Sequence, residues 1–162
     1  MARDDRLLRL SRDHHHALVM SLRIQRELPA ADESAANALF ADAARFWSAG
    51  LQPHIEVEDD ALLARLAARG DEGLAHAGRL QREHRELDEA ITLVRNGGGT
   101  AGRRAALSRF GTILGDHIRW EERELFDWLQ QRFTAEELDE VSVALSTRLP
   151  STPVVCPTPQ TL

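Results

Sequence analysis

Lysine and tyrosine are absent from this sequence of 162 residues, and cysteine occurs only once, at Cys156. The lack of tyrosine excludes a phenolate metal ligand and a tyrosyl radical. A single cysteine excludes a disulfide framework and a metal site built from thiolates. Any metal site in this chain must therefore use imidazole, carboxylate and backbone ligands.

Long apolar runs and a basic surface are also missing. No stretch approaches the roughly 20 apolar residues that span a bilayer, and the charged N-terminus leads into no apolar signal segment. The 26 acidic residues outnumber the 20 basic ones, for a net charge of -6. The basic residues form no stripe that could follow a phosphate backbone. We therefore expect a cytoplasmic protein that binds neither nucleic acid nor membrane.

The residues that are present indicate an all-α fold. Ala, Leu, Arg and Glu dominate, and no run of alternating Val, Ile and Thr occurs. Four long helices are predicted at 5–28, 32–69, 71–95 and 101–133, with a short fifth helix at 135–145. Gly50 and Pro53 predict a kink or break within the second helix. The sequence thus predicts an antiparallel up-down four-helix bundle with a short C-terminal helix.

Local signals support the helix ends and the extent of the domain. Asp32 or Ser34 could cap the second helix, and Thr134 with Glu137 forms a capping-box pattern before the fifth. The length suits one core, so one domain is expected over residues 1–148. The Pro- and Thr-rich stretch 149–162, which includes Cys156, is expected to be a disordered tail.

A histidine interrupts the apolar stripe of each long helix near its middle. The third stripe illustrates the pattern with Leu74, Ala77, Leu80, His84, Leu87, Ile91 and Val94. The corresponding histidines of the other helices are His14, His54 and His117. His54 and His117 are each followed four residues later by a glutamate, Glu58 and Glu121, which shares the same helix face.

The four histidines are expected at a similar level of the bundle. His54 precedes Gly70 by 16 residues and His84 follows it by 14, so their heights in an antiparallel hairpin differ by only about 3 Å. His84 and His117 lie 14 and 19 residues from Gly98, a difference of roughly 7 Å. His14 lies midway along its own helix and is compatible with this level.

A metal centre accounts for this polar layer better than a hydrogen-bond network does. Buried imidazoles and carboxylates each cost several kcal/mol unless something compensates them. This donor set suits iron, manganese or zinc, and two carboxylates exceed what one tetrahedral zinc needs. Two ions bridged by both carboxylates fit better. Together with a solvent-derived bridge, the four histidines and two bridging carboxylates fill about ten of the roughly twelve positions of two octahedral ions, which leaves room for a small exogenous molecule.

Four short motifs, taken in order, resemble the hemerythrin-like HHE cation-binding domain family. That family has a lone histidine on its first helix, H-x-x-x-E on its second and fourth, and E-H on its third. The resemblance covers roughly residues 5 to 133. The matching motifs are Asp13-His14, His54-Ile-Glu-Val-Glu58, Glu83-His84 and His117-Ile-Arg-Trp-Glu121.

The resemblance implies two non-haem iron ions with the two glutamates as bridges; manganese and zinc are the alternative metals. The implied ligands are His14, His54, Glu58, His84, His117 and Glu121. Members of the family carry, sense or reduce dioxygen, nitric oxide and peroxide, or handle iron. The resemblance therefore implies a protein that binds or senses dioxygen or a related small oxidant.

Several alternatives remain open at the level of the sequence. Many family members supply a fifth histidine, for which His15, His16 and His76 are the candidates here. His15 could replace His14 if the first helix is rotated, and Glu122 could replace Glu121. The alternative functions are a di-iron oxidoreductase acting on nitric oxide or peroxide, and a metal-free helical interaction module.

Overall fold

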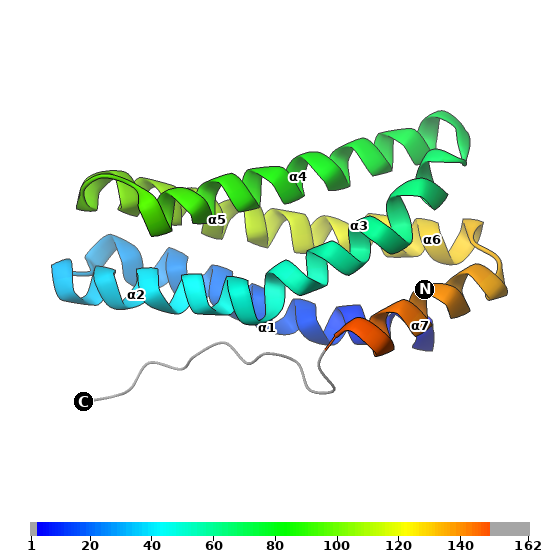
Figure 1. The fold of residues 1–162 in the computed structure, drawn as a ribbon, viewed down its shortest axis with the longest axis horizontal. Coiled ribbons are helices and arrows are strands. Elements are labelled where there is room, and N and C mark those ends of the chain that lie inside the picture. The colour runs from blue at the N-terminus through cyan, green and yellow to red at the C-terminus, as the bar shows by residue number, and fades with distance from the viewer. Residues whose placement is uncertain (1–2, 150–162) are drawn as a thin grey trace.

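The computed structural model describes residues 3–149, which form helices joined by short turns (Figure 1). A 3-10 turn at Asp5–Leu7 leads into α1 (Leu8–Glu27), and a second at Leu28–Ala30 leads to α2 (Glu33–Phe46). The remaining helices are α3 (Gln52–Ala67), α4 (Gly70–Asn96), α5 (Thr100–Trp120), α6 (Phe126–Arg132) and α7 (Ala135–Arg148). The described residues contain no strand, and the predicted all-α class is confirmed.

The helices form four long rods that lie side by side (Figure 1). The rods are α1, α2 continued by α3, α4, and α5 continued by α6. α5 packs against both α1 and α4, while α3 packs against α4. α7 packs on α3 and on the 3-10 turn at Asp5–Leu7. This is the four-helix bundle expected from the sequence, with a fifth helix added at one end.

Two of the rods contain a π-helical turn, at Trp47–Leu51 and at Glu121–Leu125. The first lies where a kink or break was expected from Gly50 and Pro53, and the wider turn takes up the proline without ending the helix. The second interrupts the helix predicted over 101–133 and was not foreseen. π-helical turns often mark functional sites.

Side-chain caps and one glycine fix the ends of the rods. The Asp32 carboxylate accepts a hydrogen bond from the Ala35 amide and caps α2. Thr134 and Glu137 form the predicted capping box before α7. Gly70 adopts a φ of 72° between α3 and α4, a conformation that favours glycine. These signals were correctly identified in the sequence.

The apolar core consists of two clusters, one on each side of a polar layer. One cluster includes Ala17, Leu51, Leu87 and Leu114, and the other includes Leu10, Val57, Leu80 and Trp120. In each rod the predicted histidine lies between a member of one cluster and a member of the other. The four histidines therefore lie at one level of the bundle, as the turn positions predicted for His54, His84 and His117.

One predicted core position is wrong. Leu74, assigned to the third stripe, is 53% exposed. It lies in the second turn of α4, close to the end of the rod. Helical periodicity predicts which face of the helix a residue lies on. It does not predict whether a neighbouring rod extends far enough to cover that face.

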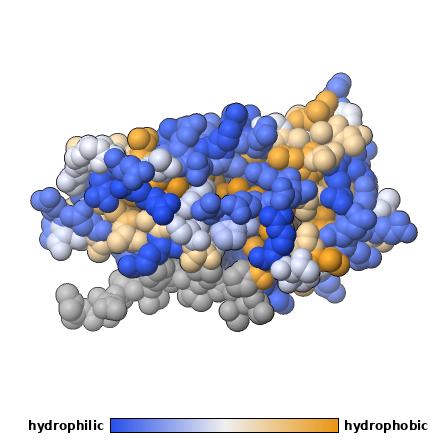
Figure 2. All heavy atoms as spheres, in the orientation of Figure 1, coloured by the Kyte–Doolittle hydropathy of each residue, from blue (hydrophilic) through white to orange (hydrophobic). Residues whose placement is uncertain are grey.

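Most residues on the face seen in Figure 2 are hydrophilic, and the hydrophobic areas between them are widest toward one end of the molecule. None of the helices in the described residues has the length and apolarity to cross a membrane. Residues 150–162, and with them Cys156 and nearly all of the predicted tail, lie outside the described residues. The domain limits at 148 and 149 thus stay a prediction, although Leu149 itself is buried.

Candidate metal centre

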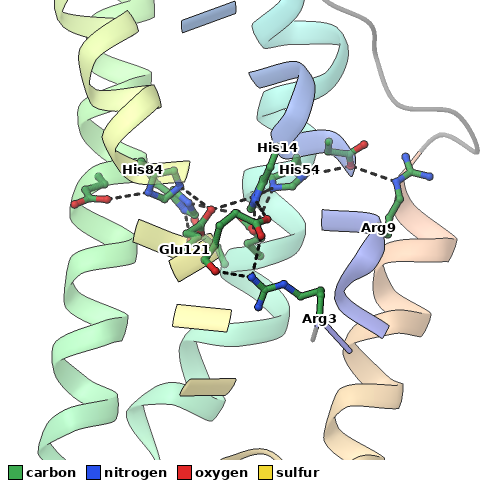
Figure 3. Close-up of polar contacts among 12 residues, drawn as sticks. Arg3, Arg9, His14, His54, His84 and Glu121 are labelled. Atoms are coloured by element: carbon green, nitrogen blue, oxygen red, sulfur yellow. Dashed lines mark hydrogen bonds and ion pairs between the residues drawn. The ribbon is translucent and has the colours of Figure 1, made fainter. Parts of the chain in front are cut away.

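The structure brings all six predicted ligands together in the polar layer (Figure 3). α1 supplies one histidine, α3 a histidine and a glutamate, α4 one histidine, and α5 with its π-helical turn a histidine and a glutamate. None is more than 3% exposed. They are His14, His54, Glu58, His84, His117 and Glu121.

Three of the histidines surround the Glu58 carboxylate. Nε2 of His54 lies 3.2 Å from Oε1 of Glu58, and Nε2 of His84 lies 3.5 Å from its Oε2. Nε2 of His14 is 3.8 Å from Oε1 and 3.2 Å from Nε2 of His54. The two oxygens of Glu58 therefore face different histidines, which is the arrangement that a bridging carboxylate requires.

Glu121 lies opposite, between His14 and His117. Its Oε2 atom is 3.1 Å from Nε2 of His14 and 3.4 Å from Nε2 of His117. Ligand atoms within 4.8 Å of one another form two overlapping groups. One group contains Glu58, His84, His117 and Glu121, and the other contains His14, His54 and Glu58. Glu58 belongs to both groups.

Each histidine is held from behind by a carboxylate of a neighbouring rod, which accepts a hydrogen bond from Nδ1. α1 supplies the carboxylate for α3, α3 for α4, α4 for α5, and the π-helical turn after α5 for α1. These contacts close a ring around the bundle, and we call the four carboxylates the outer ring. The pairs are Asp13 with His54 at 3.3 Å, Asp59 with His84 at 2.8 Å, Glu83 with His117 at 2.9 Å and Glu122 with His14 at 2.7 Å.

The outer ring fixes which nitrogen of each histidine faces the centre. Because Nδ1–H donates outward, Nε2 faces the centre and can bind a metal that displaces its proton. Arginines pair with three of the outer carboxylates and keep them ionised: Arg3 with Glu122 at 2.9 Å, Arg9 with Asp13 at 3.3 Å and Arg79 with Glu83 at 2.7 Å. The ligand orientation is thus set before any ion binds.

The carboxylates also control the charge of the buried histidines. Burial disfavours the protonated imidazoles, but the carboxylates of Glu121, Glu122 and Glu58 outweigh it and raise the pKa of His14 well above its usual range. The same balance, with Asp59 and Glu58 as the main partners, raises the pKa of His84 to about 10. Burial raises the pKa of Glu58, yet the surrounding histidines hold it well below its ordinary value. The protonated histidines and the ionised glutamates of the site therefore stabilise one another.

The donor set fits a metal cation. All four carboxylate oxygens of Glu58 and Glu121 are buried and accept no hydrogen bond from the described residues, and Nε2 of His84 also has no hydrogen-bond partner. Buried polar atoms without partners are costly. A cation among these oxygens and nitrogens would satisfy all of them at once.

The alternatives left open by the sequence are separated by burial. His14 is buried at the centre, while His15 is exposed and forms a ring pair with His16 instead. His76 packs against Trp120 and Trp128, away from the centre. In the described residues no fifth histidine joins the metal-ligand groups.

Glu121 and Glu122, the two candidates from the sequence, both contact His14. The π-helical turn that begins at Glu121 brings both side chains to the same imidazole. Glu121 faces Nε2 and the centre, whereas Glu122 faces Nδ1 from outside.

The sequence interpretation underrated the outer ring. In the sequence, Asp13 and Glu83 stand out only as parts of the family motifs, and the pattern favours a solvated or supporting position for Asp59. Each outer carboxylate is adjacent in sequence to an inner ligand, yet its partner lies on another rod. The sequence therefore shows an acidic residue beside each of these inner ligands. Which histidine that residue contacts depends on which rods are neighbours.

Comparison with known proteins agrees with this arrangement. The family described as the hemerythrin HHE cation binding domain matches residues 6–129. This chain belongs to that family, and its buried cluster of histidines and glutamates points to metal binding. No curated protein matches the chain, and no solved structure matches it either.

Proposed function

We propose that this chain holds two iron ions in the polar layer and binds dioxygen or a related small oxidant there reversibly. The observation that carries the proposal is the pair of overlapping ligand groups that share Glu58. Two groups with a common carboxylate suit two ions with a bridging ligand. Nitrogen and oxygen donors without thiolate suit iron, with manganese and zinc as the alternatives.

Iron at this site would supply the electrons and the open coordination position that dioxygen needs. The chain contributes binding, orientation and exclusion of water. The four histidines and two glutamates would hold the ions, and the outer ring would keep the imidazoles in place. The apolar clusters on both sides keep solvent away from the layer.

The lack of a proton-donating carboxyl group in the described polar layer favours reversible binding over catalytic reduction of the bound molecule. Reduction of peroxide or nitric oxide consumes protons, which a general acid near the centre would have to deliver. All four outer carboxylates accept a hydrogen bond from a histidine, and arginines pair with three of them. No carboxyl group of the described layer is placed to donate a proton to a bound molecule. The oxidoreductase acting on nitric oxide or peroxide is therefore the second candidate.

Absorption spectra of the purified, iron-replete protein test this function. The reduced protein should gain a charge-transfer band on exposure to air and lose it again when dioxygen is removed, and azide should shift the spectrum of the oxidised protein. Steady consumption of nitric oxide or peroxide, without a stable oxygenated form, would favour the enzyme. A colourless protein would contradict both, and if His54→Ala also released no metal it would support the metal-free interaction module.

The cytoplasmic location stays a prediction from the sequence.

A further inference from the structure

Two side chains confine the outer side of the His14 imidazole. Its Nδ1 atom donates a hydrogen bond to Oε1 of Glu122 at 2.7 Å. The ring of Phe126 stacks on the imidazole, with 5.3 Å between the two centroids and 15° between the two planes. The hydrogen bond resists rotation of the imidazole, and the stacked ring resists tilting. Together these contacts restrict the position of Nε2, the atom that faces the centre.

Arg3 reaches both of these side chains from outside the centre (Figure 3). One guanidinium nitrogen lies 2.9 Å from Oε2 of Glu122, and the guanidinium carbon lies 4.9 Å from the centroid of the Phe126 ring. The other terminal nitrogen donates to Asp127 and to Gln130, each at 3.4 Å. Arg3 is thereby attached to the rod of α5 and α6, and it restrains the carboxylate and the ring that confine the histidine of α1.

His117 has surroundings of the same kind. Its Nδ1 atom donates to Oε2 of Glu83 at 2.9 Å, and the ring of Trp120 lies beside it, with 6.1 Å between the centroids and 43° between the planes. Nε of Arg79 donates to Oε1 of Glu83 at 2.7 Å, and the guanidinium carbon lies 4.3 Å from the centroid of the Trp120 ring. Again one arginine contacts both the carboxylate and the aromatic ring beside a buried histidine.

The two arginines belong to different halves of the centre. His14 lies in the ligand group with His54 and Glu58, whereas His117 lies in the group with Glu58, His84 and Glu121. Different elements supply the arginines, because Arg3 precedes α1 and Arg79 lies on α4. Arg3 also precedes residues 6–129, the region that matches the family. One arginine therefore corresponds to each ligand group.

Arginine suits this place because of the shape of its guanidinium. The group combines a permanent charge, a planar fork of N–H donors and a flat face that stacks on an aromatic ring. Both arginines are only partly exposed, with side chains 16% exposed for Arg3 and 36% for Arg79. Loss of either guanidinium would release one carboxylate and uncover one ring, so one imidazole would move more freely.

We propose that Arg3 and Arg79 are positioning residues, and that each restrains one histidine and thereby sets how long one of the two ions is retained. The restraint of the imidazoles needs no metal, whereas the assignment of one ion to each arginine rests on the proposed function. The glutamine variant of each arginine is the matched control for the other, because the same change is made beside the other ligand group.

NMR of the imidazole protons in the metal-free, full-length protein tests the restraint. A hydrogen-bonded proton exchanges with water when the structure around it opens. Arg3→Gln should speed exchange of the His14 Nδ1–H about 3- to 10-fold and leave that of His117 unchanged. Arg79→Gln should do the reverse. Faster exchange at both histidines in each variant would show general loosening, and it would overturn the restraint, as would unchanged exchange in both variants.

Arg12→Gln is the control for charge. It removes the same charge from an exposed position on α1 and should change the exchange of neither histidine. An equal effect of this variant would overturn the role of the specific contacts that Arg3 makes.

Release of iron to an excess of a chromogenic chelator tests the assignment of one ion to each arginine. Release from the loaded wild type should have two phases. Arg3→Gln should speed one phase about 3- to 10-fold, Arg79→Gln the other, and the double variant both. Variants that speed the same phase, both phases equally or neither phase would overturn the assignment. A protein that binds no metal would contradict the proposed function but not the restraint, because the exchange of the imidazole protons is measured without metal.

Discussion

At the residue scale, the partly exposed carboxylates of the outer ring orient the buried histidines. Each Nδ1–H donates to a carboxylate from a neighbouring rod, so an imidazole can turn only by breaking this hydrogen bond. Mutation of such outer partners of metal ligands typically lowers metal affinity by about 10- to 100-fold. Asp59 is the most exposed member of the ring, with a side chain 34% exposed, and it is therefore the cleanest member to change.

Replacing Asp59 should weaken metal binding without unfolding the bundle. Asp59→Asn keeps the size of the side chain but removes the charge that supports His84, and metal affinity should fall by about 10- to 100-fold. Competition with a chromogenic chelator measures this change. Glu56→Gln is the matched control, because Glu56 lies on the same helix, exposed, and contacts Gln52 rather than a histidine. Equal affinity in the two variants would contradict the role of the outer ring.

The two adjacent glutamates at the π-helical turn should differ in effect. Glu121→Gln removes a carboxylate that we propose as an inner ligand, and it should abolish stable binding of one ion. Glu122→Gln removes only the outer partner of His14 and should lower affinity by about 10- to 100-fold. Metal analysis of the two purified variants, side by side, makes the comparison. The reverse order of effects would exchange the roles of the two residues.

At the scale of the elements, α1 and α5 approach closely because α5 carries glycines where they touch. A Cβ atom on Gly111 would lie 2.8 Å from Cγ2 of Ile24, and one on Gly115 would lie 2.6 Å from Oγ of Ser21. Ser21 donates a hydrogen bond to the Gly111 carbonyl at 2.7 Å, which joins the two helices. This contact sets the distance between the rod that supplies His14 and the rod that supplies His117.

An added methyl group at Gly111 should therefore destabilise the bundle. Gly111→Ala forces Ile24 and α1 outward, and overpacking of this kind costs about 1–3 kcal/mol. Gly102→Ala is the control on the same helix, because a Cβ there meets nothing within 4 Å and alanine favours the helix by roughly 0.5–1 kcal/mol. Urea unfolding of both variants measures the free energies. Equal stability of the two would show that α1 and α5 are not tightly packed.

The ionised carboxylate of Glu137 helps to hold α7 on the bundle, and acid should remove its charge. The Arg69 guanidinium beside Glu137, at 2.6 Å, and the Thr134 amide lower the pKa of that carboxyl below its ordinary 4.5. A carboxyl whose pKa is lower in the folded state stabilises the fold above the unfolded pKa, and this stabilisation is lost as the pH falls through the folded value. The free energy of unfolding should therefore fall more steeply below about pH 4.5 in the wild type than in Glu137→Gln. Parallel curves for the two proteins would contradict this contribution.

At the scale of the whole molecule, the sequence predicted the bundle and the level of the centre but not the contacts between rods. Periodicity and turn positions identified the stripes around His84 and His117, because both depend only on residues close in sequence. The outer ring, the π-helical turn at Glu121 and the exposure of Leu74 depend on neighbouring rods. The local pattern of apolar and polar residues does not show which rods lie next to each other.

A metal ion bound in the polar layer would stabilise the whole bundle. Four imidazoles and two carboxylates lie between two apolar clusters, and their burial is costly unless a cation compensates it. Metal that binds only the folded state adds stability according to its affinity. Treatment of the metal-loaded protein with a chelator should therefore lower its Tm by about 10 °C, measured by circular dichroism. The same treatment should leave the Tm of a His54→Ala, His84→Ala double variant unchanged.

The iron content of the purified protein tests the central claim most directly. The chain would be expressed with ample iron, purified without chelators, confirmed as helical by circular dichroism, and analysed by mass spectrometry for iron, manganese and zinc. The account predicts about two iron ions per chain. A folded protein with close to no bound metal would contradict it.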